Sequence, residues 1–229
     1  MKIVTLNLRH GGADRVRRIA DYLLENEAEI IVLTEFRENS SGALLTDRLT
    51  ATGLQRFVAP AQDARKNRVA LFAPSSARAL PVSPEDEDAH RIVACEVNGV
   101  AIAGVYFAQL AQKATLFDYL NKRLPPLHED VLVIGDFNTG LHYLDEPGAT
   151  FACADQFQKM GERGYSDLWR RAHGEGAREY SWMSSQRNGF RIDHAMGTGT
   201  IPSRTVACYY DHDTRRDFTD HSALWVTLR

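Results

Sequence analysis

Two polar side chains that could perform chemistry follow an apolar run near the middle of the chain. Val131–Ile134 is apolar throughout, and Gly135, Asp136 and Asn138 come directly after it. Such a run predicts a strand buried on both faces. Ligands of α/β sheets bind at the carboxyl ends of strands. On extended backbone Asp136 and Asn138 point the same way, where they could order a water molecule and hold an anionic oxygen. A strand that simply enters a turn is the alternative, since Asp, Asn and Gly favour turns.

Polar groups also end four other apolar runs. These are Asn7, Glu35, Asp193 with His194, and Asp220 with His221. Oxygen ligands with a histidine nearby suit Mg²⁺ or Mn²⁺ and do not suit a structural zinc site. A divalent cation, a carboxylate that activates water and a histidine that stabilises an oxyanion are what phosphate-ester hydrolysis requires.

The elements that must position these residues follow from hydrophobic periodicity. Predicted strands cover residues 2–6, 30–33, 56–59, 68–73, 91–97, 100–107, 131–134, 190–196, 204–209 and 222–228. Asn98-Gly99 predicts a hairpin. Predicted helices cover 14–26, 42–50, 111–124 (stopped by Pro125-Pro126), 153–160 and 165–172. Loops are expected at Pro81–Ala89, 141–150 and 173–189. Because no stretch has the composition of a linker, we expect one domain over residues 1–229.

Composition narrows the functional classes. The 229 residues are 44% hydrophobic and 25% charged, as in ordinary soluble proteins, and the net charge of −3 excludes a global basic field. Nucleic-acid binding would therefore need local clusters, such as Arg65/Lys66/Arg68 or Arg170/Arg171. Three dispersed cysteines predict reduced thiols. With no signal-peptide core and no membrane-length apolar run, we expect a cytoplasmic protein without a membrane partner, and a monomer.

Five motifs in order resemble the endonuclease/exonuclease/phosphatase (DNase I-like) superfamily. They are Thr-Leu-Asn7-Leu-Arg-His-Gly, Leu-Thr-Glu35, Gly135-Asp-Phe-Asn138, Arg191-Ile-Asp193 and Thr219-Asp-His-Ser222. The resemblance spans nearly the whole chain. It implies an α/β (α+β) fold, a four-layer αββα sandwich with two mixed β-sheets packed face to face and helices outside.

The resemblance also implies a metal site and its position. Glu35 would be the main ligand of Mg²⁺ (or Mn²⁺), with Asn7 and Asp220 close to the metal.

By the same resemblance, five residues would act on the phosphate. Asp136 would orient or deprotonate the attacking water, and Asn138 would hold that water and a phosphate oxygen. His221 would stabilise the phosphorane, with Asp193 fixing its tautomer. Tyr106 would face the phosphate, although a strand aromatic in the core is the alternative.

Within the superfamily the second half looks most like exonuclease III and the abasic-site endonucleases. The similar segments are Asp167-Leu-Trp-Arg170, Tyr180-Ser-Trp182 and Asn188-Gly-Phe-Arg-Ile-Asp193. In that group the matching residues form an apolar slot for a flipped-out, base-less sugar, which implies substrate contacts by Trp182, Phe190 and Ile192. Core packing is the alternative for each.

Three departures from the motifs of this group change the substrate that we expect. Arg9 stands where abasic-site enzymes have an acid, Tyr106-Phe-Ala-Gln109 replaces Tyr-x-Pro-Asn, and the loops after Tyr106 and Trp182 are short. Shorter loops disfavour strong duplex kinking, so single-stranded, frayed or nicked DNA becomes a better candidate than an internal abasic site. Arg9, Arg68 and Gln109 are further expected substrate contacts.

Three functions remain open. The first is a Mg²⁺-dependent nuclease that hydrolyses DNA phosphodiesters and leaves a 5′-phosphate, in DNA repair or processing. The second is a metal-dependent phosphodiesterase or phosphatase acting on a small phosphorylated or lipid substrate, favoured by the pI of about 6.2 and by Arg9-His10-Gly11. The third is a non-catalytic binding module, disfavoured by the intact set of polar residues.

Overall fold

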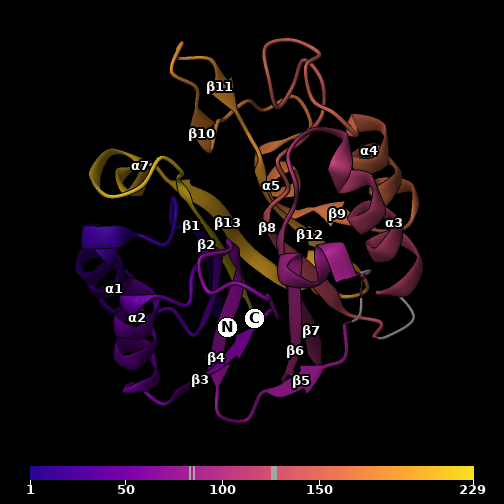
Figure 1. The fold of residues 1–229 in the computed structure, drawn as a ribbon. Coiled ribbons are helices and arrows are strands. Elements are labelled where there is room, and N and C mark those ends of the chain that lie inside the picture. Colours follow the sequence, from indigo (N-terminus) through magenta and orange to yellow (C-terminus); the bar gives the residue numbers. More distant parts are fainter. Residues whose placement is uncertain (83, 85, 125–127) are drawn as a thin grey trace.

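Two six-stranded sheets pack face to face and carry helices on their outer sides (Figure 1). The computed structural model describes residues 1–82, 84, 86–124 and 128–229. In spatial order the first sheet is β13 (Thr205–Asp211), β14 (Ala223–Leu228), β1 (Lys2–Asn7), β2 (Ile30–Phe36), β4 (Arg68–Pro74) and β3 (Leu54–Val58). The second is β5 (Arg78–Leu80), β6 (Ile92–Val97), β7 (Val100–Tyr106), β8 (Val131–Asp136), β12 (Asp193–Gly197) and β9 (Ser166–Asp167).

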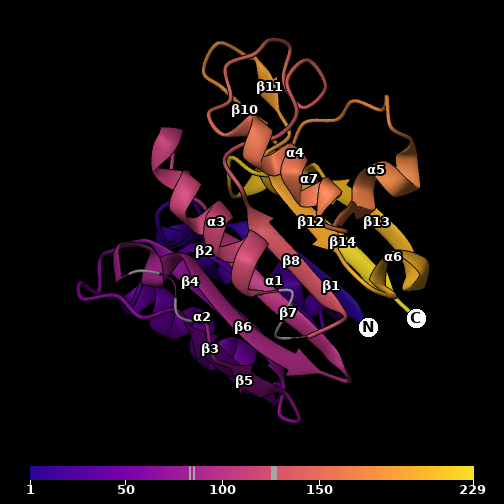
Figure 2. The same ribbon diagram turned by 90° about the vertical axis from the view of Figure 1, so that its right-hand side faces the viewer.

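Each sheet is mixed. The pairs β1–β2 and β7–β8 are parallel, and the other neighbours are antiparallel. A separate hairpin of β10 (Trp182–Met183) and β11 (Gly189–Phe190) projects beyond the sheets (Figure 2). The predicted sandwich of two mixed sheets with outer helices is confirmed.

Helices cover the two outer faces. α1 (Val16–Glu25) and α2 (Ser40–Thr50) lie on the first sheet, and α3 (Ala114–Arg123) and α4 (Ala154–Glu162) lie on the second (Figures 1 and 2). Within the described residues, the other helical segments are α5 (Leu168–His173), α6 (Ile201–Arg204), α7 (Asp213–Asp217) and the 3₁₀ turns η1 (Ala13–Arg15), η2 (Asp86–Arg91) and η3 (Leu110–Lys113). Among the described residues, no helix has the length and apolar character to cross a membrane.

The central strands are apolar without interruption because both their faces are buried. In β8, Leu132 and Ile134 face the core between the sheets, whereas Val131 and Val133 face α3 and α4. β2 behaves alike, with Ile30 and Val32 toward the other sheet and its alternate residues toward α1 and α2. Each such side chain contributes about 1.5–3 kcal/mol by burial. These rigid strands fix where the polar residues at their ends lie.

Some predicted boundaries were wrong. The single strand predicted over 190–196 is two strands, β11 and β12, interrupted at Arg191 and Ile192. The predicted loop Pro81–Ala89 already contains the start of η2, and its residues 83 and 85 lie outside the described residues, as do Pro125 and Pro126. Five short elements were not predicted: β5, β9, β10, α6 and α7.

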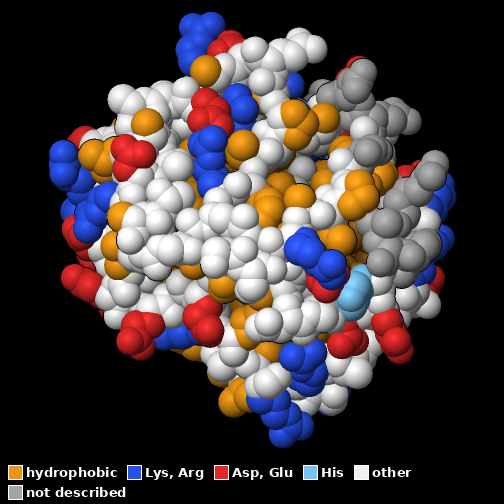
Figure 3. Space-filling view, turned by 90° about the horizontal axis from the view of Figure 1, so that it is seen from below, with side chains coloured by type: hydrophobic (Ala, Val, Ile, Leu, Met, Phe, Trp, Pro, Cys, Tyr) orange, Lys and Arg blue, Asp and Glu red, His pale blue; other side chains and the backbone are white. Residues whose placement is uncertain are grey.

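The two ends of the sandwich differ in character. The end seen in Figure 3 mixes acidic and basic side chains around scattered apolar ones. The hairpin β10–β11 and the carboxyl ends of β1 and β8 lie at the other end, shown at the top of Figure 1. The polar residues that follow these strands gather there.

Candidate active site

A cavity of about 320 Å³ brings together most of the residues predicted to form a site. Its lining consists of His10, Glu35, Tyr106, Gln109, Asp136, Asn138, Phe151, Trp182, Phe190, Ile192, Asp220 and His221. These residues come from both sheets and from the loops between them. Ten of the twelve were predicted to be site residues; no role in the site was predicted for His10 or Phe151.

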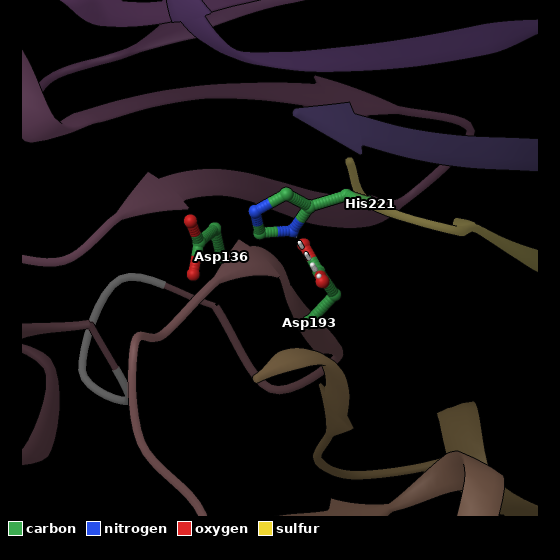
Figure 4. A group of neighbouring side chains, drawn as sticks. All are labelled: Asp136, Asp193 and His221. Carbon is green, nitrogen blue, oxygen red and sulfur yellow. Dashed lines mark hydrogen bonds and ion pairs between the residues drawn. The ribbon is translucent and has the colours of Figure 1, made fainter. Parts of the chain in front are cut away.

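His221 and Asp193 form a buried pair. Asp193 Oδ2 lies 2.8 Å from His221 Nδ1, and both side chains are almost inaccessible to solvent. The other ring nitrogen of His221 faces Asp136 (Figure 4). Burial alone would lower the pKa of His221, but the charge and hydrogen bond of Asp193 outweigh it and raise the pKa to about 9. His221 is therefore held as an imidazolium that can donate toward the cavity.

Asp136 ends β8 opposite Asp193 of β12. Gly135 precedes it with a φ of 149°, and a Cβ there would lie 2.0 Å from the carbonyl oxygen of Val105, so only glycine fits. Asp136 Oδ2 accepts from Asn7 Nδ2 at 3.0 Å. Burial and the neighbouring Asp193 raise the pKa of Asp136, while His221 opposes that rise. A carboxylate with a raised pKa suits proton abstraction from water.

Asn138 does not continue the extended backbone that the sequence suggested. Its φ is 49°, and its N–H donates to Asp136 Oδ1 at 2.9 Å. Its Nδ2 donates to the carbonyl of Phe107 at 2.9 Å and lies 3.4 Å from Asp136 Oδ2. Lys113, which is buried, donates from Nζ to the carbonyl of Asn138 at 2.5 Å. Four contacts thus hold the left-handed turn, and Asn138 still reaches the cavity.

Glu35 lies at an irregularity between β2 and β4, where the register shifts between Leu33 and Phe36. Its φ of 54° is unusual for a non-glycine residue and costs on the order of 1–3 kcal/mol. Glu35 Oε2 accepts from the backbone N–H of His10 at 2.6 Å. In the described part of the chain, the contacts of Glu35 Oε1 are long: 3.3 Å from Asn7 Nδ2 and 3.4 Å from Tyr106 Oη. That oxygen is available to a further partner.

The donor chemistry fits a hard divalent cation. Asp220 Oδ1 is buried and has no hydrogen-bond partner among the described residues, and Asp220 Oδ2 has only distant contacts with Arg9 (3.7 Å) and Trp182 (3.5 Å). Glu35 Oε1 and Asp220 Oδ1 are thus carboxylate oxygens without close partners, as Mg²⁺ requires. Asn7 presents Nδ2 toward the carboxylates and accepts from the Arg9 N–H through Oδ1 at 2.8 Å, so it orients Glu35.

A second set of potential ligands has a different role in this geometry. Asp136, Asp193 and His221 offer ligand atoms that lie within 4.8 Å of one another. His221 Nδ1 is already committed to Asp193, and an imidazolium cannot bind a metal. The group is therefore better described as an acid–base cluster beside the carboxylates that suit the cation.

Aromatic side chains form one wall of the cavity. Trp182 and Phe190 are paired across β10 and β11 with ring centroids 5.7 Å apart, and Phe151 lies 5.7 Å from Phe190. A β-bridge joins Trp182 to His221, which fixes the hairpin beside the acid–base cluster. Ile192 is buried and lines the same cavity.

Two predicted substrate contacts do not line the cavity. Arg68 is buried and donates to the carbonyl of Asp63 at 2.7 Å, so it holds the loop before β4; its contact with substrate stays a prediction. Arg9 is exposed next to Asp220. Sequence analysis missed Phe151 and Lys113 because neither belongs to a strand end. Only the Arg9-His10-Gly11 motif signalled His10.

The chain is similar to known proteins in sequence family and in fold. A family model described as the endonuclease/exonuclease/phosphatase family matches residues 4–221. No curated protein sequence matches significantly. Among solved structures, a 3′-5′ exonuclease (NExo) from Neisseria meningitidis superposes with a TM-score of 0.84 at 21% identity, covering 100% of this chain and 99% of the other. An AP endonuclease from Archaeoglobus fulgidus gives 0.81 at 19% identity over 100% and 99%. An AP endonuclease from Leishmania major gives 0.74 at 15% over 100% and 87%.

Fold and site together define a hydrolase built on a four-layer sandwich. The chain belongs to the endonuclease/exonuclease/phosphatase family. The predicted membership and the predicted enzymatic class are thereby confirmed.

Proposed function

We propose that the protein is a Mg²⁺-dependent nuclease that hydrolyses phosphodiester bonds of DNA, in the manner of exonuclease III and the abasic-site endonucleases. One observation carries the proposal: the aromatic wall of Trp182, Phe190 and Phe151 stands directly beside the acid–base cluster. Flat apolar rings suit the sugar and base faces of a nucleotide. A similar fold is described as a 3′ phosphatase, NExo from Neisseria, bound to a product DNA hairpin (TM-score 0.82, 21% identity).

The residues suit an in-line attack of water on phosphorus. Asp136 takes a proton from the water, whose oxygen forms a new bond to phosphorus. His221 donates a hydrogen bond to a non-bridging phosphate oxygen as negative charge builds there. The bond from phosphorus to the 3′ oxygen breaks. The departing 3′ oxygen takes a proton from solvent and becomes a 3′ hydroxyl, and the phosphate stays on the 5′ oxygen of the other fragment.

Several groups support these two residues. Tyr106 lines the cavity where its hydroxyl can donate to a phosphate oxygen. Asn138 also lines the cavity, and its Oδ1 can accept a hydrogen bond from the attacking water. Asp193 keeps His221 charged and oriented. Glu35 and Asp220 would hold the divalent cation, with Asn7 orienting Glu35. When bound, the cation supplies positive charge that neutralises the phosphate oxygens.

The deciding experiment compares five substrates, each with Mg²⁺ and with EDTA. They are single-stranded DNA, nicked duplex, duplex with one abasic-site analogue, duplex with a 3′-phosphate end, and a chromogenic small phosphodiester. Asp136→Asn, purified in parallel, controls for contaminating nucleases. EDTA-sensitive cutting of any DNA by the wild type alone is the expected result. If only the small phosphodiester were hydrolysed, the proposed function would change from a nuclease to a phosphodiesterase acting on small molecules.

A further inference from the structure

A second cavity of about 320 Å³ lies beside the catalytic one. The two share Tyr106 and Gln109 as walls, so whatever occupies one is next to the other. The second cavity, here called the flanking pocket, is otherwise lined by Arg37, Lys66, Asn67, His90, Arg91 and Ala108. These residues come from the β2–α2 and β3–β4 connections, η2 and the segment after β7.

The flanking pocket is strongly basic. None of the described residues that line it is acidic, and three are Arg or Lys. The pKa of buried His90 falls to about 4, first because of burial and then because of the positive charges of Arg91, Lys66 and Arg68. The histidine is therefore neutral, so the charge of the flanking pocket comes from its Arg and Lys side chains.

The three cations differ in how they are held. Arg37 Nε donates to Asn67 Oδ1 at 2.6 Å, and its Nη2 lies 3.3 Å from His10 Nδ1. Arg91 pairs with Asp88 at 2.9 Å and lies over the ring of Tyr106. Both guanidinium groups are thus pre-positioned.

Lys66, by contrast, is exposed, and its side chain makes no ion pair or hydrogen bond within the described part of the chain. Its neighbours in the basic cluster of the sequence are engaged elsewhere, since Arg65 pairs with Asp63 and Arg68 is buried. Lys66 is the cation of this cluster that is left for a ligand.

We propose that the flanking pocket binds the backbone phosphate next to the scissile one on the same DNA strand. The inference rests on the proposed nuclease function and names a subsite for it. Arg and Lys are the side chains that recognise phosphate, and a pre-positioned guanidinium does so at low entropic cost. Because Tyr106 and Gln109 line both cavities, a strand whose scissile phosphate lies at Asp136 and His221 can extend past them and place its neighbouring phosphate in the flanking pocket.

The test measures binding of single-stranded oligonucleotides in the non-cleaving Asp136→Asn background. Lys66→Ala should weaken binding about three- to tenfold and should reduce the slope of log affinity against log salt by about 1. Lys122→Ala removes a lysine from α3, where it pairs with Asp118, and should change neither quantity.

A methylphosphonate placed at successive positions locates the contact. At one position next to the scissile phosphate, loss of the charge should weaken binding when Lys66 is present and have no further effect in Lys66→Ala. If the methylphosphonate weakened binding equally with and without Lys66, or if Lys66→Ala left the salt slope unchanged, the proposed phosphate contact in the flanking pocket would be wrong.

The two proposals can fail separately. If the wild type binds DNA through Lys66 but does not cut it, the nuclease is wrong and the phosphate pocket stands. If DNA is cut but the Lys66→Ala and methylphosphonate effects are additive, only the pocket is wrong.

Discussion

Replacing Asp193 with Asn should remove the charge that keeps His221 protonated while conserving the shape of the side chain. The pKa of His221 is about 9, against an ordinary value of 6.5, although burial alone would lower it. That difference corresponds to roughly 3 kcal/mol of preference for the imidazolium. Without the carboxylate charge we expect the pKa of His221 to fall to 6.5 or below.

The consequence for rate follows from the protonated fraction. At pH 8 a histidine with a pKa of about 9 is about nine-tenths protonated, whereas at 6.5 it is about 3% protonated. If the imidazolium donates to the phosphate oxygen, Asp193→Asn should lose at least about 30-fold in kcat/KM at pH 8. The loss should be smaller at pH 6.

The assay is a pH profile of kcat/KM from pH 5.5 to 10, with the pKa of His221 read by NMR of labelled histidine. In the wild type, activity should rise as Asp136 ionises and fall as His221 loses its proton near pH 9. In Asp193→Asn the falling limb should move below pH 7. A falling limb that stays near pH 9 would refute the argument, since His221 would not be the titrating group.

The pH dependence of thermal stability tests the His221–Asp193 pair independently of activity. Because the folded-state pKa of His221 lies above the unfolded value, its stabilisation is complete below about pH 6.5 and is lost as pH rises toward 9. The Tm of the wild type should therefore fall over this range more steeply than that of Asp193→Asn. Glu179→Gln, which alters the pair of Glu179 with His212 outside the cavity, should leave the activity profile unchanged.

Three further outcomes are expected. Glu35→Gln should raise the Mg²⁺ concentration needed for half-maximal activity by tenfold or more, because it removes a charged ligand; a metal titration that overlays the wild type would exclude Glu35 from the metal site. Asp136→Asn should lower kcat by about 10²–10⁴-fold with little change in DNA binding. The same substitution should raise the Tm in EDTA above pH 7. The pKa of Asp136 is raised in the folded protein, so its ionised form destabilises the folded state. Trp182→Ala should reduce activity on an abasic-site duplex more than on single-stranded DNA, and equal losses on both would assign Trp182 to supporting the hairpin.

Much of the architecture was predictable from local pattern. Both faces of strands such as β2 and β8 are buried, so consecutive residues in them are apolar. A continuous apolar run of this kind can be recognised from a few neighbouring residues in the sequence. The polar residues near their carboxyl ends, Glu35 in β2 and Asp136 in β8, could be recognised because they interrupt or end these apolar runs. Sheet pairing then brings Asp136 opposite Asp193.

The split of the predicted strand over 190–196 shows where local pattern fails. Its sequence is apolar enough to continue, but Arg191 is fully buried between Asp145 and Asp167, with contacts of 2.6 and 2.5 Å. A buried charge must keep its partners, because an unpaired one costs several kcal/mol. Those partners lie 46 and 24 residues away in the sequence, so no window around Arg191 reveals them.

The sequence by itself predicted which side chains would carry the chemistry, and those side chains lie at or next to the ends of strands in the sandwich. Tertiary structure decided how they face one another: the left-handed turns at Glu35 and Asn138, the support from Lys113, and the aromatic wall completed by Phe151. It also assembled the flanking pocket around Lys66 from separate connections. The physical reason is that a buried strand must be built from a run of neighbouring apolar residues, which the sequence shows directly. The position of a loop depends instead on contacts between segments far apart in the chain.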